Sequence, residues 1–109
     1  MEFIGKKPLS VNECWQGQRR KTEGYRKYEH DCLFLLPRLT LPAPPYCIEL
    51  VFGVSNMAAD FDNPVKPFVD ILQKKYGFND KHIMQATIKK HLTPKGKEFI
   101  GFEITQFNA

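Results

Sequence analysis

The sequence predicts an α+β fold, in which helices cover one mixed β-sheet within a single small domain. Three observations support this prediction. The chain has 109 residues, a length that suits one hydrophobic core and would leave two weak cores if it were divided. Apolar residues recur at helical spacing in some segments and alternate as in strands in others. These segments follow the order β-α-β-α-β-β, which predicts one mixed sheet with helices packed against it over residues 1–109.

The composition is that of a folded protein with a modest basic excess. Hydrophobic residues make up 42% of the chain and aromatic residues 13%, above the levels of a disordered chain. Lys and Arg number 16 against 12 Asp and Glu, which gives a net charge of +4. Basic residues gather in the first quarter and acids around residues 60–62, so the chain could hold nucleic acid around a metal site. Lysines that only solvate the surface explain the charge equally well.

The cysteine pattern and the hydropathy limit where the protein acts. Cys14, Cys32 and Cys47 are widely spaced and form no paired C-x-x-C motif for zinc or redox chemistry, so a reduced intracellular compartment fits best. No stretch approaches the roughly 18 apolar residues of a membrane span, and the first residues lack the order of a secretory signal. We therefore expect a cytoplasmic protein with no membrane partner.

The N-terminal part predicts a strand, a basic loop and a helix. Residues 1–5 can form a short strand, and residues 6–21 are basic and show no sustained period. Thr22 is a good N-cap, and Pro37 interrupts the helical pattern, so the helix should end near Leu36. The apolar stripe of this helix is expected to face the core and comprises Tyr25, Tyr28, Cys32, Leu35, Leu36 and Leu39.

The middle of the chain predicts a second strand and a second helix. Residues 46–54 alternate with a period of two, as in a half-buried strand. The face expected to be buried carries Tyr46, Ile48, Leu50, Phe52 and Val54. Asn63 should cap a helix in which Pro64 is the first residue, and Gly77 should end it. The buried face of this helix should carry Val65, Phe68, Val69, Leu72 and Tyr76.

Two further strands are expected at residues 83–91 and 98–106. The turn Pro94-Lys95-Gly96 lies between them and is typical of a hairpin. Ile100, Phe102 and Ile104 alternate inward in the second of these strands. The two strands are therefore predicted to be neighbours in the sheet.

The most informative segment is the acidic run that follows the strand at residues 46–54. Asp60 and Asp62 are separated by one residue, so on extended chain they project to the same side, roughly 6–7 Å apart, while Phe61 points to the core. Asp80, in the loop before the next strand, is well placed to add a third carboxylate. Mg²⁺ prefers octahedral oxygen ligands and keeps several waters, so these carboxylates suit a site that must also admit a phosphate.

The same segment fits phosphodiester hydrolysis. Bound Mg²⁺ would lower the pKa of a coordinated water and polarise the phosphodiester, and no Cys, Ser or His nucleophile is needed. Lys66 would project near the N-terminus of the helix, where its ammonium can hold a scissile phosphate or stabilise charge that develops on it. Spacing alone leaves a second interpretation open, because Asp60 and Asp62 could simply cap the helix.

The acidic segment also carries a recognisable motif. It reads Asp60-Phe61-Asp62-Asn63-Pro64-Val65-Lys66-Pro67-Phe68-Val69-Asp70 and is followed by Gly77-Phe78-Asn79-Asp80. This arrangement resembles the D-x-D-N-x-x-K-x-x-x-D and later glycine-hydrophobic-x-D pattern of RusA-type Holliday junction resolvases. The resemblance implies a Mg²⁺ site made of Asp60, Asp62 and Asp80, supported in catalysis by Lys66. Asn63 and Asp70 match motif positions whose role we expect to be structural.

The resemblance covers most of the chain, because Pro8-Leu9-Ser10-Val11-Asn12 and the last strands are also similar to the family. It implies a homodimer with two metal sites, each of which nicks one of two opposed strands of a four-way DNA junction. The setting it implies is phage or prophage recombination and replication. One difference stands out: several relatives carry arginines just before the first aspartate, where this chain has Met57-Ala58-Ala59. DNA contacts there must be weaker or supplied elsewhere.

The basic loop is the expected source of other DNA contacts. Arg19, Arg20 and Lys21 could bind phosphates, and Trp15 could stack on exposed bases at the junction centre, although large aromatic residues are more often part of a core. Two other functions stay open. One is a non-enzymatic DNA-binding module in which the aspartates are structural caps. The other is a carboxylate-metal nuclease that acts on other branched DNA or on RNA.

Overall fold

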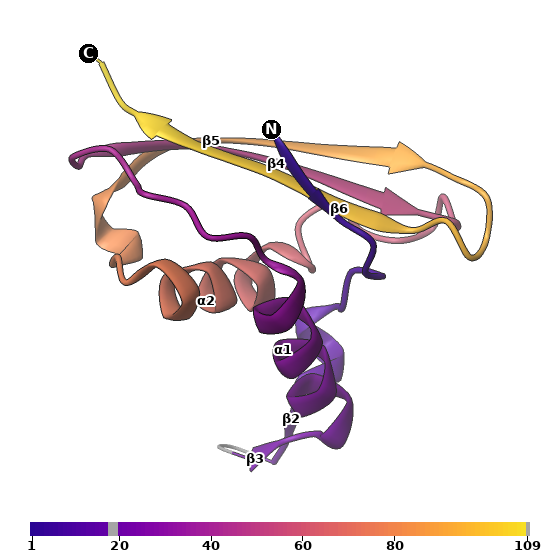
Figure 1. Cartoon of the computed structure of the whole chain (residues 1–109). Coiled ribbons are helices and arrows are strands. Elements are labelled where there is room, and N and C mark those ends of the chain that lie inside the picture. The colour runs from indigo at the N-terminus through magenta and orange to yellow at the C-terminus, as the bar shows by residue number, and fades with distance from the viewer. Residues whose placement is uncertain (18–19, 109) are drawn as a thin grey trace.

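The computed structural model describes residues 1–17 and 20–108, and it confirms the α+β class. A four-stranded mixed sheet has the strand order β1-β6-β4-β5, and both helices lie on the same side of it (Figure 1). The strands of this sheet are β1 (Glu2–Ile4), β4 (Tyr46–Val54), β5 (Ile83–Leu92) and β6 (Phe99–Gln106), and the helices are α1 (Glu23–Leu35) and α2 (Val65–Tyr76). No helix within the described ranges is long and apolar enough to cross a membrane.

Short elements occupy the segment between β1 and α1, where only a loop was predicted. A 3-10 helix, η1 (Val11–Glu13), is followed by β2 (Trp15–Gln16) and β3 (Arg20–Lys21), which pair as a small antiparallel ribbon. A second 3-10 helix, η2 (Asp80–His82), precedes β5. Strands of two residues are too short to leave a periodic signal, so the sequence pattern did not predict the ribbon.

The hydrophobic core lies between the two helices and the inner face of the sheet. The alternation expected for β4 is confirmed from Tyr46 to Phe52, whereas Val54, expected on the same face, is only half-buried. β6 presents Ile100 and Phe102 to this face, as predicted. Phe68 of α2 meets the rings of Phe52 and Phe102 edge-on, at centroid distances of 6.3 and 5.9 Å. These ring contacts hold α2 against the two central strands. The buried residues of β4 on this face are Tyr46, Ile48, Leu50 and Phe52.

Helix α1 begins and ends where its flanking residues predict. Thr22 Oγ1 accepts a hydrogen bond of 3.1 Å from the backbone N of Tyr25, and Leu36 is the C-cap. The buried residues of the stripe are Tyr25, Tyr28, Cys32 and Leu36. Leu35 and Leu39 were expected in the same stripe but are 42% and 39% exposed. The helix ends at Leu35, so Leu39 lies beyond it and no longer shares its buried face. At this end of the helix the buried residue is Leu36, next to Leu35.

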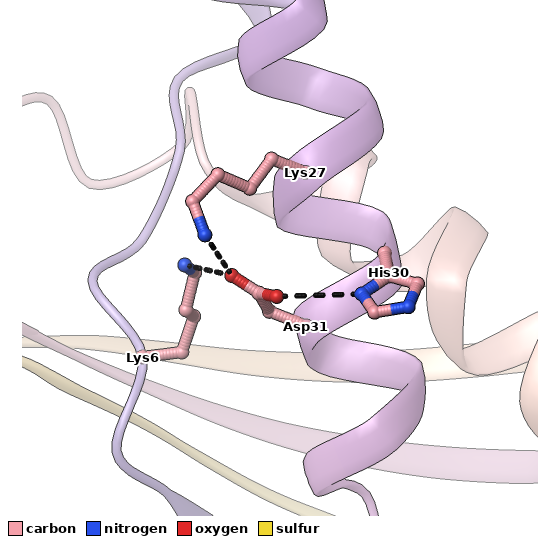
Figure 2. Close-up of polar contacts among 4 residues, drawn as sticks. All are labelled: Lys6, Lys27, His30 and Asp31. Carbon is pink, nitrogen blue, oxygen red and sulfur yellow. Dashed lines mark hydrogen bonds and ion pairs between the residues drawn. The ribbon is translucent and has the colours of Figure 1, made fainter.

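An ion cluster joins α1 to the segment that follows β1. The Asp31 carboxylate accepts hydrogen bonds from Lys6 Nζ at 2.7 Å and from Lys27 Nζ at 3.1 Å (Figure 2). The His30 ring is turned toward the other Asp31 oxygen, at 3.5 Å. The two ammonium groups hold the pKa of the Asp31 carboxyl well below its usual value. Lys6 thereby ties the chain that leaves β1 to the surface of α1.

The predicted hairpin between the last two strands is wrong. β4 lies between them and pairs with β5 in parallel and with β6 in antiparallel orientation. The parallel pairing needs a crossover, which α2 supplies. β4 is largely buried and gains partners on both sides, whereas β5 is mostly exposed and suits the sheet edge. The chain after β5 crosses the end of β4, where Thr93 N donates a 2.8 Å hydrogen bond to the Val54 carbonyl.

Candidate metal centre

The candidate ligands Asp60 and Asp62 lie in the loop between the C-terminal end of β4 and α2. Asn56 organises the first part of this loop. Its carbonyl accepts a hydrogen bond of 3.1 Å from the backbone N of Ala59, and its side chain accepts one of 2.9 Å from the backbone N of Ala58. The aspartates therefore follow a hydrogen-bonded turn.

The aspartates are not on an extended strand. Residues 60–62 lie in irregular, bent chain, and Phe61, which was expected to point to the core, is 58% exposed. That expectation is wrong because the alternation of side chains applies only within the sheet, which β4 leaves at Val54. Asp60 and Asp62 are both exposed, so their carboxylates are accessible to an ion and to a phosphate.

Asn63 holds Asp60 instead of capping α2. Its Nδ2 atom donates a hydrogen bond of 2.8 Å to Asp60 Oδ2, and its carbonyl accepts one of 2.9 Å from the backbone N of Val11. α2 begins at Val65, and no side chain of the described residues caps its N-terminus. The prediction of Asn63 as N-cap is therefore wrong, because its amide is engaged by Asp60. The same observation argues against Asp60 and Asp62 as caps of this helix.

Lys66, in the first turn of α2, is shared by two carboxylates. Its Nζ atom lies 2.9 Å from Asp70 Oδ1 and 3.6 Å from Asp80 Oδ2. The hydrogen bond to Asp70 is the main reason that the pKa of the Lys66 ammonium is raised above its ordinary value, and the charge of Asp80 adds to the effect. The Lys66 side chain is 63% exposed, so its charged end is accessible to a ligand.

Asp80 is brought back toward α2 by the turn that follows the helix. Gly77 ends α2 with a φ of 71°, in the left-handed region that favours glycine, and this confirms the prediction. The backbone N of Asp80 then donates a hydrogen bond of 2.8 Å to Gln73 Oε1, and Gln73 Nε2 donates one of 3.3 Å to Asp70 Oδ1. Gln73 therefore links the two acids that face Lys66. Its role could not be inferred from spacing, which is that of any polar residue on a helix.

A groove between α2 and β5 brings Asp62, Lys66 and Asp80 onto one surface. Its volume is about 510 Å³. The three charged residues come from the loop before α2, from α2 and from η2 after it. Asp60 is not among the described residues that line the groove. The walls are apolar and comprise Ile48, Leu50, Val65, Val69, Ile83, Ala86 and Ile88.

The donor type at this site suits Mg²⁺, but the donors are not gathered as an ion bound by all three aspartates would need. Exposed carboxylates offer the hard oxygen ligands that this ion prefers, and an open groove leaves room for the waters that it retains. Among residues 1–17 and 20–108, no three His, Cys, Asp or Glu side chains are gathered closely enough to hold an ion. Asp60 is bound to Asn63 and Asp80 faces Lys66. An ion that used all three aspartates would therefore have to compete with these partners.

Three of the predicted DNA-binding residues, Trp15, Arg20 and Lys21, lie on the β2–β3 ribbon, at the end of α1 that is remote from the sheet (Figure 1). Arg20 is exposed. Lys21 is engaged within the protein, with its Nζ atom 3.1 Å from Glu29 Oε2. Trp15 is 45% exposed, so part of its indole is accessible for stacking. Arg19 was predicted to bind phosphate and lies outside the described residues.

No protein-family model matches this chain, and no curated protein matches it.

Proposed function

We propose that the protein is a Mg²⁺-dependent, structure-selective DNA endonuclease that resolves four-way junctions by phosphodiester hydrolysis. The observation that carries this proposal is the approach of Lys66 to Asp80, at 3.6 Å, on a groove that Asp62 also lines. The motif resemblance gives these residues a joint role, and simple helix capping has no use for Asp80 beside Lys66. No side chain in the described chain caps α2, which weakens the competing role of the aspartates.

Asp60, Asp62 and Asp80 would hold the metal. Bound Mg²⁺ supplies a Lewis acid that activates water and polarises the phosphodiester. Asn63 restrains the Asp60 carboxylate through its hydrogen bond of 2.8 Å. Asp62 and Asp80 line a common groove, which supports their acting on the same ligand.

Lys66 would bind the phosphate. Its ammonium has three donors, of which Asp70 takes one at 2.9 Å, while Asp80 lies further away at 3.6 Å. If Asp80 turns to the metal, the Lys66 ammonium becomes available to a phosphate oxygen and can stabilise the negative charge of the transition state. Asp70 continues to hold the lysine in place, in agreement with the structural role expected at its motif position.

A four-way junction must be cut in two strands, and we propose a homodimer in which each site nicks one of them. This part rests on the resemblance to RusA-type resolvases, as does a phage or prophage role in the bacterial cytoplasm. The β2–β3 ribbon, which carries the exposed Arg20 and the half-exposed Trp15, would contact the DNA arms outside the groove.

Cleavage of a labelled four-way junction with and without Mg²⁺ tests the proposal. We expect nicks in two opposed strands that require Mg²⁺ and are suppressed by a chelator. Linear duplex, flapped duplex and RNA of matched sequence measure the selectivity. Junction binding without cleavage would indicate a non-enzymatic DNA-binding module. Equal cleavage of flaps or RNA would indicate a carboxylate-metal nuclease of a different specificity.

A further inference from the structure

Lys90 connects β5 to the loop that carries the aspartates. Its Nζ atom donates hydrogen bonds of 2.8 Å to the backbone carbonyls of Met57 and Ala59. Both carbonyls belong to the turn that comes immediately before Asp60. The contact therefore joins the edge strand of the sheet to the segment from which the first candidate ligand projects.

The position of Lys90 in β5 explains why it reaches this loop. In the parallel register Lys90 pairs with Phe52 of β4, just as Ile88 pairs with Leu50. Phe52 and Leu50 are buried on the inner face of the sheet, so Lys90 and Ile88 point to that face as well. Lys89 points to the opposite face and is exposed, whereas Lys90 is half-buried.

The two carbonyls compensate for the partial burial of the Lys90 ammonium. Burial of a cation costs free energy of hydration unless hydrogen bonds within the protein replace the lost contacts with water. An ammonium has three donors, and the carbonyls of Met57 and Ala59 accept two of them. Hydrogen bonds from a charged donor are stronger than those between neutral groups. The strand and the loop therefore restrain each other.

We propose that Lys90 is a positioning residue for the metal site: it fixes the turn before Asp60 and so restricts the conformations from which the carboxylates of the segment 60–62 can reach an ion. This inference rests on the proposed function. The segment is also anchored on its other side, where the Asn63 carbonyl accepts a hydrogen bond of 2.9 Å from the backbone N of Val11. The two aspartates thus lie between two fixed points. Lys90 donates to carbonyls, so it acts through the backbone and not as a catalytic group.

Ordering of the loop before the ion arrives favours metal binding. A loose loop that carries two like charges would lose conformational entropy when an ion binds, and this loss would reduce the affinity. Residues that support metal ligands typically change affinity or activity by about 10–100-fold when they are removed. We expect an effect in this range for Lys90.

The matched variants Lys90→Met and Lys89→Met test the inference. Each removes one lysine from β5, but only the first removes the bonds to the loop. We expect Mn²⁺ binding to the full chain, measured by calorimetry, to weaken by about 10–100-fold in Lys90→Met and by less than about twofold in Lys89→Met. Hydrogen exchange at the amides of Ala58 and Ala59, which both bond to Asn56, should accelerate only in Lys90→Met.

Unchanged Mn²⁺ affinity or unchanged hydrogen exchange in Lys90→Met would overturn the inference and leave the proposed function in place. A parent protein that binds no Mn²⁺ and cuts no junction would overturn both. Junction binding in the presence of a chelator should be equal in the parent and in Lys90→Met. Weaker junction binding by Lys90→Met under these conditions would reveal a general defect and contradict a specific positioning role. If Lys90→Met does not fold, Lys90→Gln, which keeps a neutral donor near the carbonyls, replaces it in the same comparison.

Discussion

Lys66 Nζ lies 3.6 Å from Asp80 Oδ2, although Lys66 is in the first turn of α2 and Asp80 follows the end of that helix. The contact depends on the turn at Gly77, which sends the chain back along the helix. It also makes the two residues interdependent, because Asp80 cannot turn fully to an ion without releasing the lysine.

We expect Asp60→Asn and Asp62→Asn to abolish Mg²⁺-dependent cleavage and to leave the fold and junction binding intact. Asparagine keeps the shape of the side chain but removes the charge that binds the ion. Junction binding should tighten slightly, because one carboxylate fewer repels the phosphates. Glu49→Gln, at an exposed acid in the middle of β4, is the matched control in cleavage assays. Asn variants that cut as fast as the parent would show that these aspartates are not ligands.

Asp80→Asn should match the other two variants in its cleavage defect. It should also lower the pKa of Lys66, since the charge of Asp80 contributes to raising that pKa. NMR titration of the Lys66 side chain measures the second effect without any need for activity. A defect in cleavage much smaller than that of Asp62→Asn would remove Asp80 from the ion's ligands.

Lys66→Ala should separate catalysis from metal binding. Loss of one preorganised electrostatic stabiliser typically costs about 10²–10³ in rate, or roughly 2.7–4 kcal/mol, so turnover should collapse while Mg²⁺ affinity changes little. Single-turnover cleavage at saturating Mg²⁺ and enzyme measures the effect, and Lys81→Ala, at an exposed lysine next to Asp80, is the control. If Lys66 served only its ion pairs, less than about 1 kcal/mol would be at stake and the rate would stay within about threefold of the parent.

Neutralisation of Arg19, Arg20 and Lys21 together should weaken junction binding and flatten its salt dependence. Each phosphate contact that is lost lowers the slope of log affinity against log salt by about 0.9. Lys21 already pairs with Glu29, so Arg20→Gln alone should account for more of the change than Lys21→Gln alone. Cleavage at saturating protein should survive. An unchanged salt slope in the triple variant would mean that the ribbon does not contact DNA.

The ion cluster on α1 predicts an acid-sensitive contribution to stability. Hydrogen bonds from Lys6 and Lys27 lower the pKa of Asp31 from its ordinary value of 3.8. A carboxyl whose pKa is lower in the folded chain stabilises the fold fully above the ordinary value, and this contribution is lost as the pH falls toward the lowered pKa. Below about pH 3.8 the free energy of unfolding, measured with urea, should therefore fall more steeply in the parent than in Asp31→Asn. Parallel curves would contradict a stabilising role of the cluster.

Features that depend on one residue and its neighbours were predicted correctly. Thr22 caps α1 and Gly77 ends α2 because a hydroxyl acceptor and a left-handed backbone are local preferences. The inner face of β4 follows in the same way from a period of two. Such signals are complete within a few residues of sequence.

Features that depend on distant parts of the chain could not be predicted from the same signals. The Pro94-Lys95-Gly96 turn looks the same whether the next strand pairs with β5 or crosses to the far side of β4, and burial of β4 decides between them. The bond from Asn63 to Asp60 could not be inferred either, because it depends on how the loop is bent and held by Val11. Lys90 did leave a signal in the sequence. It is two residues after Ile88 and therefore lies on the same face of the strand, and a lysine on a buried face requires a specific polar partner.

The strand order β1-β6-β4-β5 has a consequence for how the chain folds. Among the described residues, β1 pairs only with β6, and β4 receives both of its neighbours from segments that follow it. The sheet is therefore built entirely from contacts between distant segments, a topology that favours slow folding. Until β6 docks, β1 has no partner and one edge of β4 is open. A chain caught at that stage would be prone to aggregation, and its protection depends on β6, which is synthesised after the other strands of this sheet.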